Sequence, residues 1–320
     1  MFSIRFCVNV LVIALVTTEV CLASHHSLLN HQRHFERIGP DYRNGDSVSF
    51  LDIKHTFGLQ HIRVGKWVNR EESALAANLI FDSLADLANI LAVPPELIGL
   101  RGSLRFAFGH GGQKGVQAHY SPAYRELALA KNAGAGALAH EYWHAFDHYI
   151  ADKMFIDDSI LDPYLSSLVL SEQTANTSRT FSRANLFACA SDNWLADKSI
   201  IAHPLNKKLS SLFKVTLLSA NGQEPHDYVR RSIALDKQQR CHYFAKPTEM
   251  MARAFESCIE MYSQDYAEIS NPYLVNSTID SPLTKHGAYP DAEHCREIYQ
   301  AMMEYFEPLG LAFDKQQGAK

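Results

Sequence analysis

The pattern of hydrophobic and polar positions predicts a mainly helical chain. A one-sided leucine stripe predicts a helix that starts after Asn69 and ends at Pro94-Pro95. The stripe consists of Leu75, Leu79, Leu84, Leu87 and Leu91. Asn69 and Glu72 have the spacing of a capping box, in which each side chain bonds the other residue's backbone N–H. We therefore expect a core helix here.

Three short segments with weaker alternation follow and predict a small sheet. They cover residues 103–108, 115–120 and 125–131. The Gly109-His110-Gly111-Gly112 run between the first two lacks the spacing of a phosphate-binding loop. It predicts a turn of the sheet. Strands between long helices give an α+β fold that is mostly helical.

Helical periodicity returns in the second half of the chain. Helices are expected at residues 133–152, 209–218, 228–235, 248–263 and 291–306. Gly134 and Gly136 predict that the first of these begins in close packing against the sheet. Thr248 is the expected N-cap of the fourth. Its expected buried face consists of Met251, Ala254, Phe255, Cys258 and Ile259.

The predicted organisation is a single domain with extra segments. The domain covers residues 66–312, carries an insertion at about 153–205, follows a polar segment at 24–65 and precedes a flexible tail at 313–320. Residues 1–23 have the parts of a signal peptide, with Arg5, an apolar run and a small-residue ending. The alternative is a start codon placed too far upstream. A signal peptide implies a periplasmic or secreted protein, and its absence a cytoplasmic one.

Composition narrows the function. The chain has 320 residues and 47% hydrophobic content, enough for a sizeable core, and 30 basic against 35 acidic residues give a net charge of −5. A net negative charge disfavours a protein that binds along a nucleic-acid backbone, because such binding needs clustered positive charge. No later segment is long and apolar enough to span a membrane. Sixteen histidines suggest imidazole chemistry. Those at positions 25, 26, 31 and 34 fix no geometry and favour a solvated leader over a metal site.

Cysteine usage leaves the redox state open. Without the leader, the cysteines are Cys189, Cys241, Cys258 and Cys295, which allow either disulfides or free thiols. None belongs to a C-x-x-C pair, which disfavours a thiolate zinc site.

The segment His140-Glu141-Tyr142-Trp143-His144 has the form H-E-x-x-H. Residues four apart share one face of a helix, so His140 and His144 can bind one Zn²⁺ together. Glu141 lies beside them and can accept a proton from a zinc-bound water, which then attacks a carbonyl. The alternative is an ordinary helix that carries these residues by chance.

A third ligand is needed. The metzincin pattern requires a histidine six residues after His144, where Ile150 stands, so that class is excluded. Glu249 and Glu256, on the helix predicted at 248–263, are the carboxylates available from a later helix. Seven residues separate them, about 10.5 Å of rise, so one ion cannot use both. The alternative for Glu249 is a salt bridge with Arg253.

Two further residues lie next to the motif. His148 is too far along the helix to share an ion with His140, which leaves it solvated or supporting a ligand. Asp147 can accept the outer N–H of a ligating histidine, or it is an exposed carboxylate. The spacing does not decide between these.

Two segments resemble the zincin domain of the anthrax toxin lethal factor family. The segments His140–Tyr149 (HEYWHAFDHY) and Glu249–Glu256 (EMMARAFE) match its H-E-x-x-H-A-x-D-x-Y and E-x-x-A-x-A-F motifs. The stretch from Phe106 to Tyr149 looks closer still to a large polyvalent protein associated domain of phage and mobile-element polyproteins. Most of residues 32–310 resemble the bacterial family CLCA-X.

The resemblance implies a gluzincin-like fold that holds one Zn²⁺. His140, His144 and Glu249 would be the ligands, and Glu141 the catalytic base. The expected function is a zinc metallopeptidase with a peptide or protein substrate. The alternative is a non-catalytic binding or effector module. The lethal factor family also has a tyrosine seven residues before its ligand glutamate; here His242 occupies that position and Tyr243 follows it. Either can donate to an oxyanion, and Tyr243 can equally be a core aromatic.

Overall fold

The computed structural model describes residues 36–110, 117–131, 136–154, 164–167, 200–222, 224–266, 269–279 and 281–318. The predicted signal peptide, the four histidines near the N-terminus, Cys189 and most of the predicted insertion lie outside these ranges.

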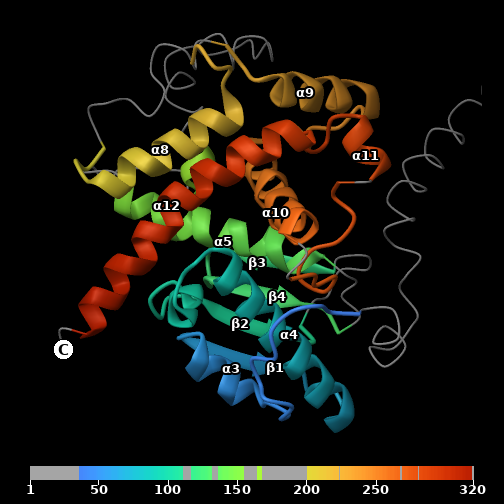
Figure 1. Ribbon diagram of the computed structural model, residues 1–320. Helices are drawn as coiled ribbons and strands as arrows, with labels where there is room; N and C mark the ends of the chain where they lie inside the picture. The colour runs from blue at the N-terminus through green and yellow to red at the C-terminus, as the bar shows by residue number, and fades with distance from the viewer. Residues whose placement is uncertain are drawn as a thin grey trace, which may run out of the picture.

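The described chain folds as a mostly helical α+β protein. Its helices are α3 (Phe50–Thr56), α4 (Arg70–Ile90), the 3₁₀ helix η1 (Pro95–Gly99), α5 (Ala137–Met154), α8 (Pro204–Leu217), α9 (Asp227–Gln239), α10 (Pro247–Tyr266), α11 (Pro282–Lys285) and α12 (Ala292–Gly318). Its strands are β1 (His61–Val64), β2 (Arg105–Phe108), β3 (Ala118–Ser121) and β4 (Glu126–Leu129). Helix α5 runs through the centre, with the sheet on one side and α8, α10 and α12 on the other (Figure 1).

The four strands form a mixed sheet in the order β1-β2-β4-β3. Strands β1, β2 and β4 are parallel, whereas β3 pairs antiparallel with β4 and forms one edge. Helix α5 packs on β3 and β4. The sheet therefore presents an edge strand next to the helix that carries the H-E-x-x-H motif.

The predicted strands at 103–108, 115–120 and 125–131 are confirmed as β2, β3 and β4. Strand β1 and helix α3 were not anticipated, because both lie in the segment at 24–65 whose composition is polar. Their contacts explain the omission: β1 alternates between exposed and half-buried residues, and only Phe50 and Ile53 of α3 are buried. Such short segments show little of the periodicity on which sequence analysis depends.

Several helix boundaries also differ from expectation, and α8 begins at Pro204 instead of residue 209. Helix α10 begins at Pro247, so Thr248 lies inside the first turn and its prediction as N-cap is wrong. In any helix, the backbone N–H at the first position has no partner within the helix. Proline, which lacks this N–H, therefore suits that position. Helix α12 continues past Phe306 to Gly318 through Pro308.

Aromatic packing holds α5 to the helices behind it. Trp143 is 1% exposed, and its ring lies 5.1 Å from Phe255 of α10 and 6.3 Å from Phe213 of α8, between ring centres. Because Trp143 precedes His144, this packing fixes the rotation of α5 about its axis. The buried face predicted for α10 is confirmed.

The first turn of α5 is held by the loop at residues 271–276. Gly136 has φ +93°, and a Cβ added to it would meet the backbone N of Asn276 at 2.7 Å. Gly136 therefore packs closely against this loop. The small residues had led us to expect close packing against the sheet instead. The N–H of Ala139 donates to Leu274 O. Asn271 in turn bonds the buried carboxylate of Asp86 at 2.8 Å, which ties the loop to α4.

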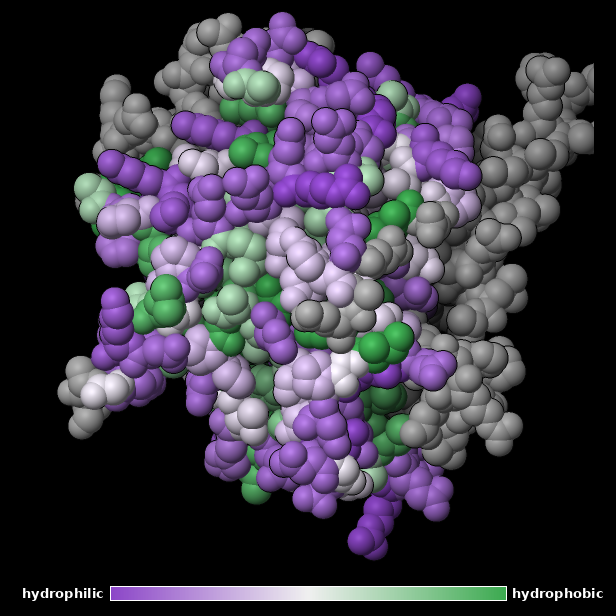
Figure 2. All heavy atoms as spheres, viewed as in Figure 1, coloured by the Kyte–Doolittle hydropathy of each residue, from purple (hydrophilic) through white to green (hydrophobic). Residues whose placement is uncertain are grey.

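The surface offers no large apolar face in the view of Figure 2. Hydrophilic residues predominate there, and hydrophobic residues form small groups between them. No helix within the described ranges has the length and apolar character required to cross a bilayer.

The capping box of α4 gives a test of the fold. Asn69 Oδ1 accepts the N–H of Glu72 at 2.9 Å, and Glu72 Oε2 accepts the N–H of Asn69 at 3.1 Å. We expect Asn69→Ala to lower the free energy of unfolding by about 1 kcal/mol, measured by urea denaturation. Asn69→Asp keeps an acceptor oxygen and should remain near wild type. Equal losses in both variants would contradict this role of the cap.

Candidate metal centre

The structure brings His140, His144 and Glu249 together, although 105 residues separate the second from the third. The Nε2 atoms of the two histidines lie 3.2 Å apart. Glu249 Oε2 lies 3.3 Å from His140 Nε2, and Glu249 Oε1 lies 3.7 Å from His144 Nε2. One ligand atom from each residue falls within 4.8 Å of the others. Helices α5 and α10 pack together, which brings the three side chains to one point.

This donor set fits a zinc ion. Two Zn–N bonds of about 2.1 Å at a tetrahedral angle place their nitrogens about 3.4 Å apart, close to the separation of the two imidazoles. Two imidazoles and one carboxylate form a known ligand set for catalytic zinc. Glu249 Oε2 is buried and has no hydrogen-bond partner, although it lies next to His140 Nε2. A buried carboxylate oxygen without a partner is costly, and a cation at this point would satisfy it.

The charges of the cluster compensate one another. Burial opposes a charge on His140, but the carboxylates of Glu256 and Glu249 raise its pKa to about 10. Burial and the charge of His140 lower the pKa of His144 to about 3. Burial alone would raise the pKa of Glu249, yet the two histidines lower it to about 2. A protonated His140 thus provides the positive charge that the two glutamates require.

The two glutamates of α10 have different positions, as their spacing requires. Glu249 faces the paired Nε2 atoms, whereas Glu256 Oε1 lies 3.2 Å from His140 Nδ1 on the opposite side of the ring. A carboxylate at the outer nitrogen orients a ligating imidazole and fixes its tautomer. Glu256 thus lies at the outer nitrogen of a paired histidine, the position that the sequence suggested for Asp147.

The alternative pairing of Glu249 with Arg253 is not what the structure shows. Arg253 is 3% exposed and donates through Nε to Ala288 O at 2.7 Å and through Nη2 to Phe244 O. Its guanidinium also lies 5.4 Å from the ring centre of Tyr243. Arg253 thus fastens α10 to the segments on either side of it, and the ion pairs of Glu249 are with the histidines.

Glu141 lies at the same site, between the cluster and the edge strand. Burial, together with the charge of Glu249, raises its pKa to about 7, against the opposing effects of His140 and of the backbone N–H of Tyr120. Tyr120 belongs to β3. A carboxyl group with a pKa near neutrality, next to a metal site, has the properties expected of a general base.

Tyr243 lies beside Glu249, and His242 does not. The Tyr243 hydroxyl bonds the Glu249 carboxylate and helps to lower its pKa, while the tyrosine remains 42% exposed. Burial and Glu249 raise the pKa of Tyr243, so its proton is retained. His242 is exposed, and its ion pair is with Asp236 at 3.9 Å. Of the two candidates for a donor, Tyr243 is the one near the cluster.

The loop that carries Tyr243 is built on a single buried carboxylate. Asp236 accepts the backbone N–H groups of Tyr243, Phe244 and Ala245 at 3.0, 2.9 and 3.0 Å, and its side chain is fully buried. Burial alone would raise the pKa of Asp236, but these donors and the Cys241 thiol lower it. Sequence analysis missed Asp236 because nothing in its spacing marks it as a loop anchor.

The remaining candidates have structural contacts. His148 Nδ1 lies 2.7 Å from the Tyr120 hydroxyl, so it joins α5 to β3. Asp147 is fully buried rather than exposed, and it accepts the N–H and hydroxyl of Ser166. The outer Nδ1 of His144 is buried without a hydrogen-bond partner, so Asp147 does not orient it. Among the described cysteines, Cys258 and Cys295 are free thiols.

Comparison with known proteins gives one match. Residues 235–313 match the family described as large polyvalent protein-associated domain 1. This supports the predicted resemblance to that family over about a quarter of the chain. The match includes Tyr243, Glu249 and Glu256 but neither His140 nor His144, and the stretch from Phe106 to Tyr149 lies outside it. No curated protein and no solved structure matches the chain.

The Asp236 anchor can be tested by its removal. We expect Asp236→Asn to lower the free energy of unfolding by about 1–3 kcal/mol, because one acceptor oxygen is replaced by a donor facing the Ala245 N–H. The pKa of the Asp236 carboxyl is lower in the folded protein than in the unfolded chain. This stabilisation is therefore fully present above the unfolded-state pKa and is lost as the pH falls through the folded-state pKa. The difference from wild type in chemical denaturation should therefore shrink below about pH 4.

His242→Ala is the matched control, because His242 lies in the same loop but is exposed. Its free energy of unfolding should stay within about 0.5 kcal/mol of wild type. A loss equal to that of Asp236→Asn would refute the anchor.

Proposed function

We propose that this protein is a zinc-dependent metallopeptidase of the gluzincin-like type. The observation that carries the proposal is the convergence of His140 Nε2, His144 Nε2 and the Glu249 carboxylate, with Glu141 beside them. His140, His144 and Glu249 would hold one Zn²⁺, and Glu256 would orient His140. The mixed sheet, the H-E-x-x-H helix α5 and the ligand helix α10 agree with a zincin-like fold.

The residues around the cluster have complementary roles in this proposal. Zinc supplies Lewis acidity, which lowers the pKa of water and polarises a carbonyl. Glu141 accepts a proton from the attacking water on its carboxylate and returns it to the leaving amine. Tyr243, whose hydroxyl keeps its proton, would move its hydrogen bond from Glu249 to the oxyanion that develops on the substrate carbonyl.

The edge of the sheet suggests how a substrate would bind. Among the described residues, strand β3 pairs only with β4, and Tyr120 within it lies against Glu141. An extended peptide can add to such an edge through backbone hydrogen bonds. In this position its scissile carbonyl would lie close to the base. A peptide or protein substrate follows from this arrangement.

A second candidate is a non-catalytic binding or effector module with the same fold. Two observations favour it. The matched family is described by its association with polyvalent proteins and not by an activity. His140 also pairs with Glu249 and Glu256 as an ion-paired imidazolium would, so the cluster is partly satisfied without an ion. Activity and metal content have to be measured separately to distinguish the two candidates.

The first test replaces the base. We expect gently purified wild-type protein to contain one zinc per chain and to cleave a peptide library. Glu141→Gln should keep the zinc but lose about 10²–10⁴-fold in cleavage rate, because the amide cannot accept the proton. Glu304→Gln, an exposed glutamate on α12, is the control and should match wild type.

Each other outcome has a defined meaning. Zinc without cleavage in the wild type would favour the non-catalytic module. Unchanged cleavage in Glu141→Gln would refute its role as base. Protein without stoichiometric zinc would reject the metallopeptidase and would leave only a non-catalytic module that holds no metal.

The second test concerns the two glutamates of α10. Glu249→Ala removes a proposed ligand and should weaken zinc binding by more than about 100-fold. Glu256→Ala removes the orienting carboxylate and should weaken it by about 10–100-fold. Competition with a chromophoric chelator measures both constants, with Glu304→Ala as the control. Unchanged affinity in Glu249→Ala would place the third ligand elsewhere.

A further inference from the structure

A cavity lies on the face of α5 directed away from the candidate metal centre. Its volume is about 520 Å³, within the range of about 300–1,000 Å³ that small-molecule sites occupy. Its α5 wall consists of Tyr142, Phe146, Tyr149, Ile150 and Lys153. With 3.6 residues per turn, this face is nearly opposite to the face of His140 and His144. The cavity is therefore separate from the proposed catalytic site.

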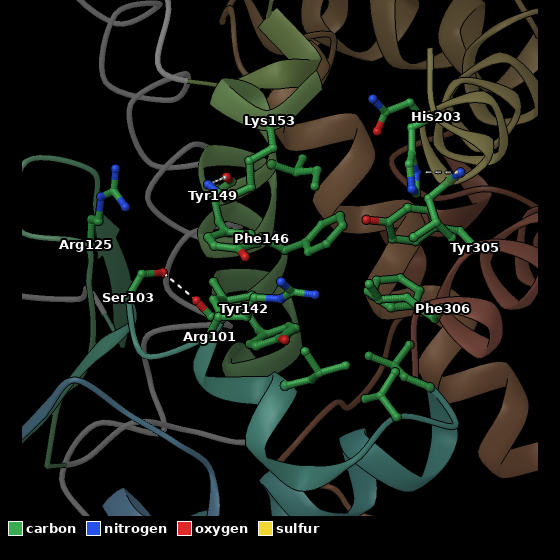
Figure 3. A pocket seen from close by; sticks show the side chains of 18 residues that line it. Arg101, Ser103, Arg125, Tyr142, Phe146, Tyr149, Lys153, His203, Tyr305 and Phe306 are labelled. Carbon is green, nitrogen blue, oxygen red and sulfur yellow. Dashed lines mark hydrogen bonds between the residues drawn. The ribbon is translucent and has the colours of Figure 1, made fainter. Parts of the chain in front are cut away.

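The interior of the cavity is apolar. Helices α5 and α12 contribute opposite walls (Figure 3), and the segment around η1 and Leu205 of α8 complete the lining. The apolar lining consists of Leu91, Val93, Leu97, Leu100, Phe146, Ile150, Leu205, Phe306 and Leu309. Hydrocarbon placed against such a surface is removed from water, which is favourable by about 25 cal/mol per Å².

The charged residues of the lining are all basic. Arg101, Arg125 and Lys153 line the cavity, and no described lining residue is acidic. Asp152 lies close by and pairs with Lys153 at 2.5 Å and with Arg125 at 3.9 Å. Arg101 has no ion pair with any described carboxylate, and its guanidinium points into the space between α5 and α12 in Figure 3. One acid against three bases leaves a net positive rim.

Three tyrosines add hydroxyl groups to the same cavity. The pKa of Tyr305 is raised by burial and by Tyr149 and is lowered by Arg101, and burial and the other two tyrosines raise the pKa of Tyr142. Tyr142, Tyr149, Tyr305 and Arg101 all line the same cavity. None of the three hydroxyls is hydrogen-bonded to a described residue, so they are available to a ligand.

We propose that this cavity binds a small amphipathic anion, namely a single acyl chain that ends in a carboxylate. The apolar lining would hold the chain, and Arg101 would pair with the carboxylate, which matches the planar fork of a guanidinium. Three basic residues against one neighbouring acid favour an anion over a cation or a neutral head group. The proposal is independent of zinc and of catalysis.

Titration calorimetry of the full chain with decanoate tests the proposal. We expect saturable binding of one decanoate per chain, weaker binding of decanol and no binding of decyltrimethylammonium. Arg101→Gln should weaken decanoate binding about tenfold or more and leave decanol unchanged. Leu205→Trp, which fills the cavity from its half-buried wall, should weaken both.

Arg70→Gln is the matched control, because Arg70 is an exposed arginine outside the cavity and should leave all three ligands unaffected. A thermal melt of each variant shows that it is folded. The proposal is overturned if decanoate does not bind to the wild type, as would happen if another part of the chain filled the cavity. It is equally overturned if decyltrimethylammonium binds as well as decanoate, or if neither Arg101→Gln nor Leu205→Trp changes decanoate binding.

Discussion

The packing of α5 against α10 is the constraint on which the proposed site depends. Paired imidazoles four residues apart are a local feature of α5, but they become a three-ligand cluster only when Glu249 approaches from α10. Trp143 and Phe255 fix the rotation of the two helices with their rings 5.1 Å apart. A rotation of either helix by one residue, about 100°, would remove its ligands from the common point.

Burial of charge is the cost of this arrangement, and neighbouring residues offset it. Glu249 and Glu256 are both largely buried, which is tolerated only with partners nearby. His140 lies between the two carboxylates. Arg253 adds a positive charge to the same helix and donates hydrogen bonds to the backbone of the adjoining segments. A divalent ion at the Nε2 atoms would replace the proton that His140 otherwise carries, so metal and proton compete for one place.

Local sequence patterns predicted the parts of the site that depend on a single helix. The spacing of His140 and His144, the capping box at Asn69 and the buried face of α10 all follow from helical periodicity. The choice between Glu249 and Glu256 came from resemblance, because both lie on the same helix and their spacing excludes only joint use. Asp236 and Arg253 act through backbone groups distant in sequence, so no pattern in the chain marks them.

The cavity is the clearest example of a feature that hydrophobic periodicity in the sequence cannot predict. Each apolar residue in it looks like ordinary core, since a stripe on α5 or α12 predicts burial without stating whether a neighbour fills the space. The empty volume lies between residues of η1, α5, α8 and α12, and Arg101 is part of its lining. Helix α5 would thus serve both proposed sites, and its opposite faces separate a cluster rich in carboxylates from a rim rich in cations. This separation would keep an anionic ligand away from the candidate metal centre, where the carboxylate of Glu249 would repel it.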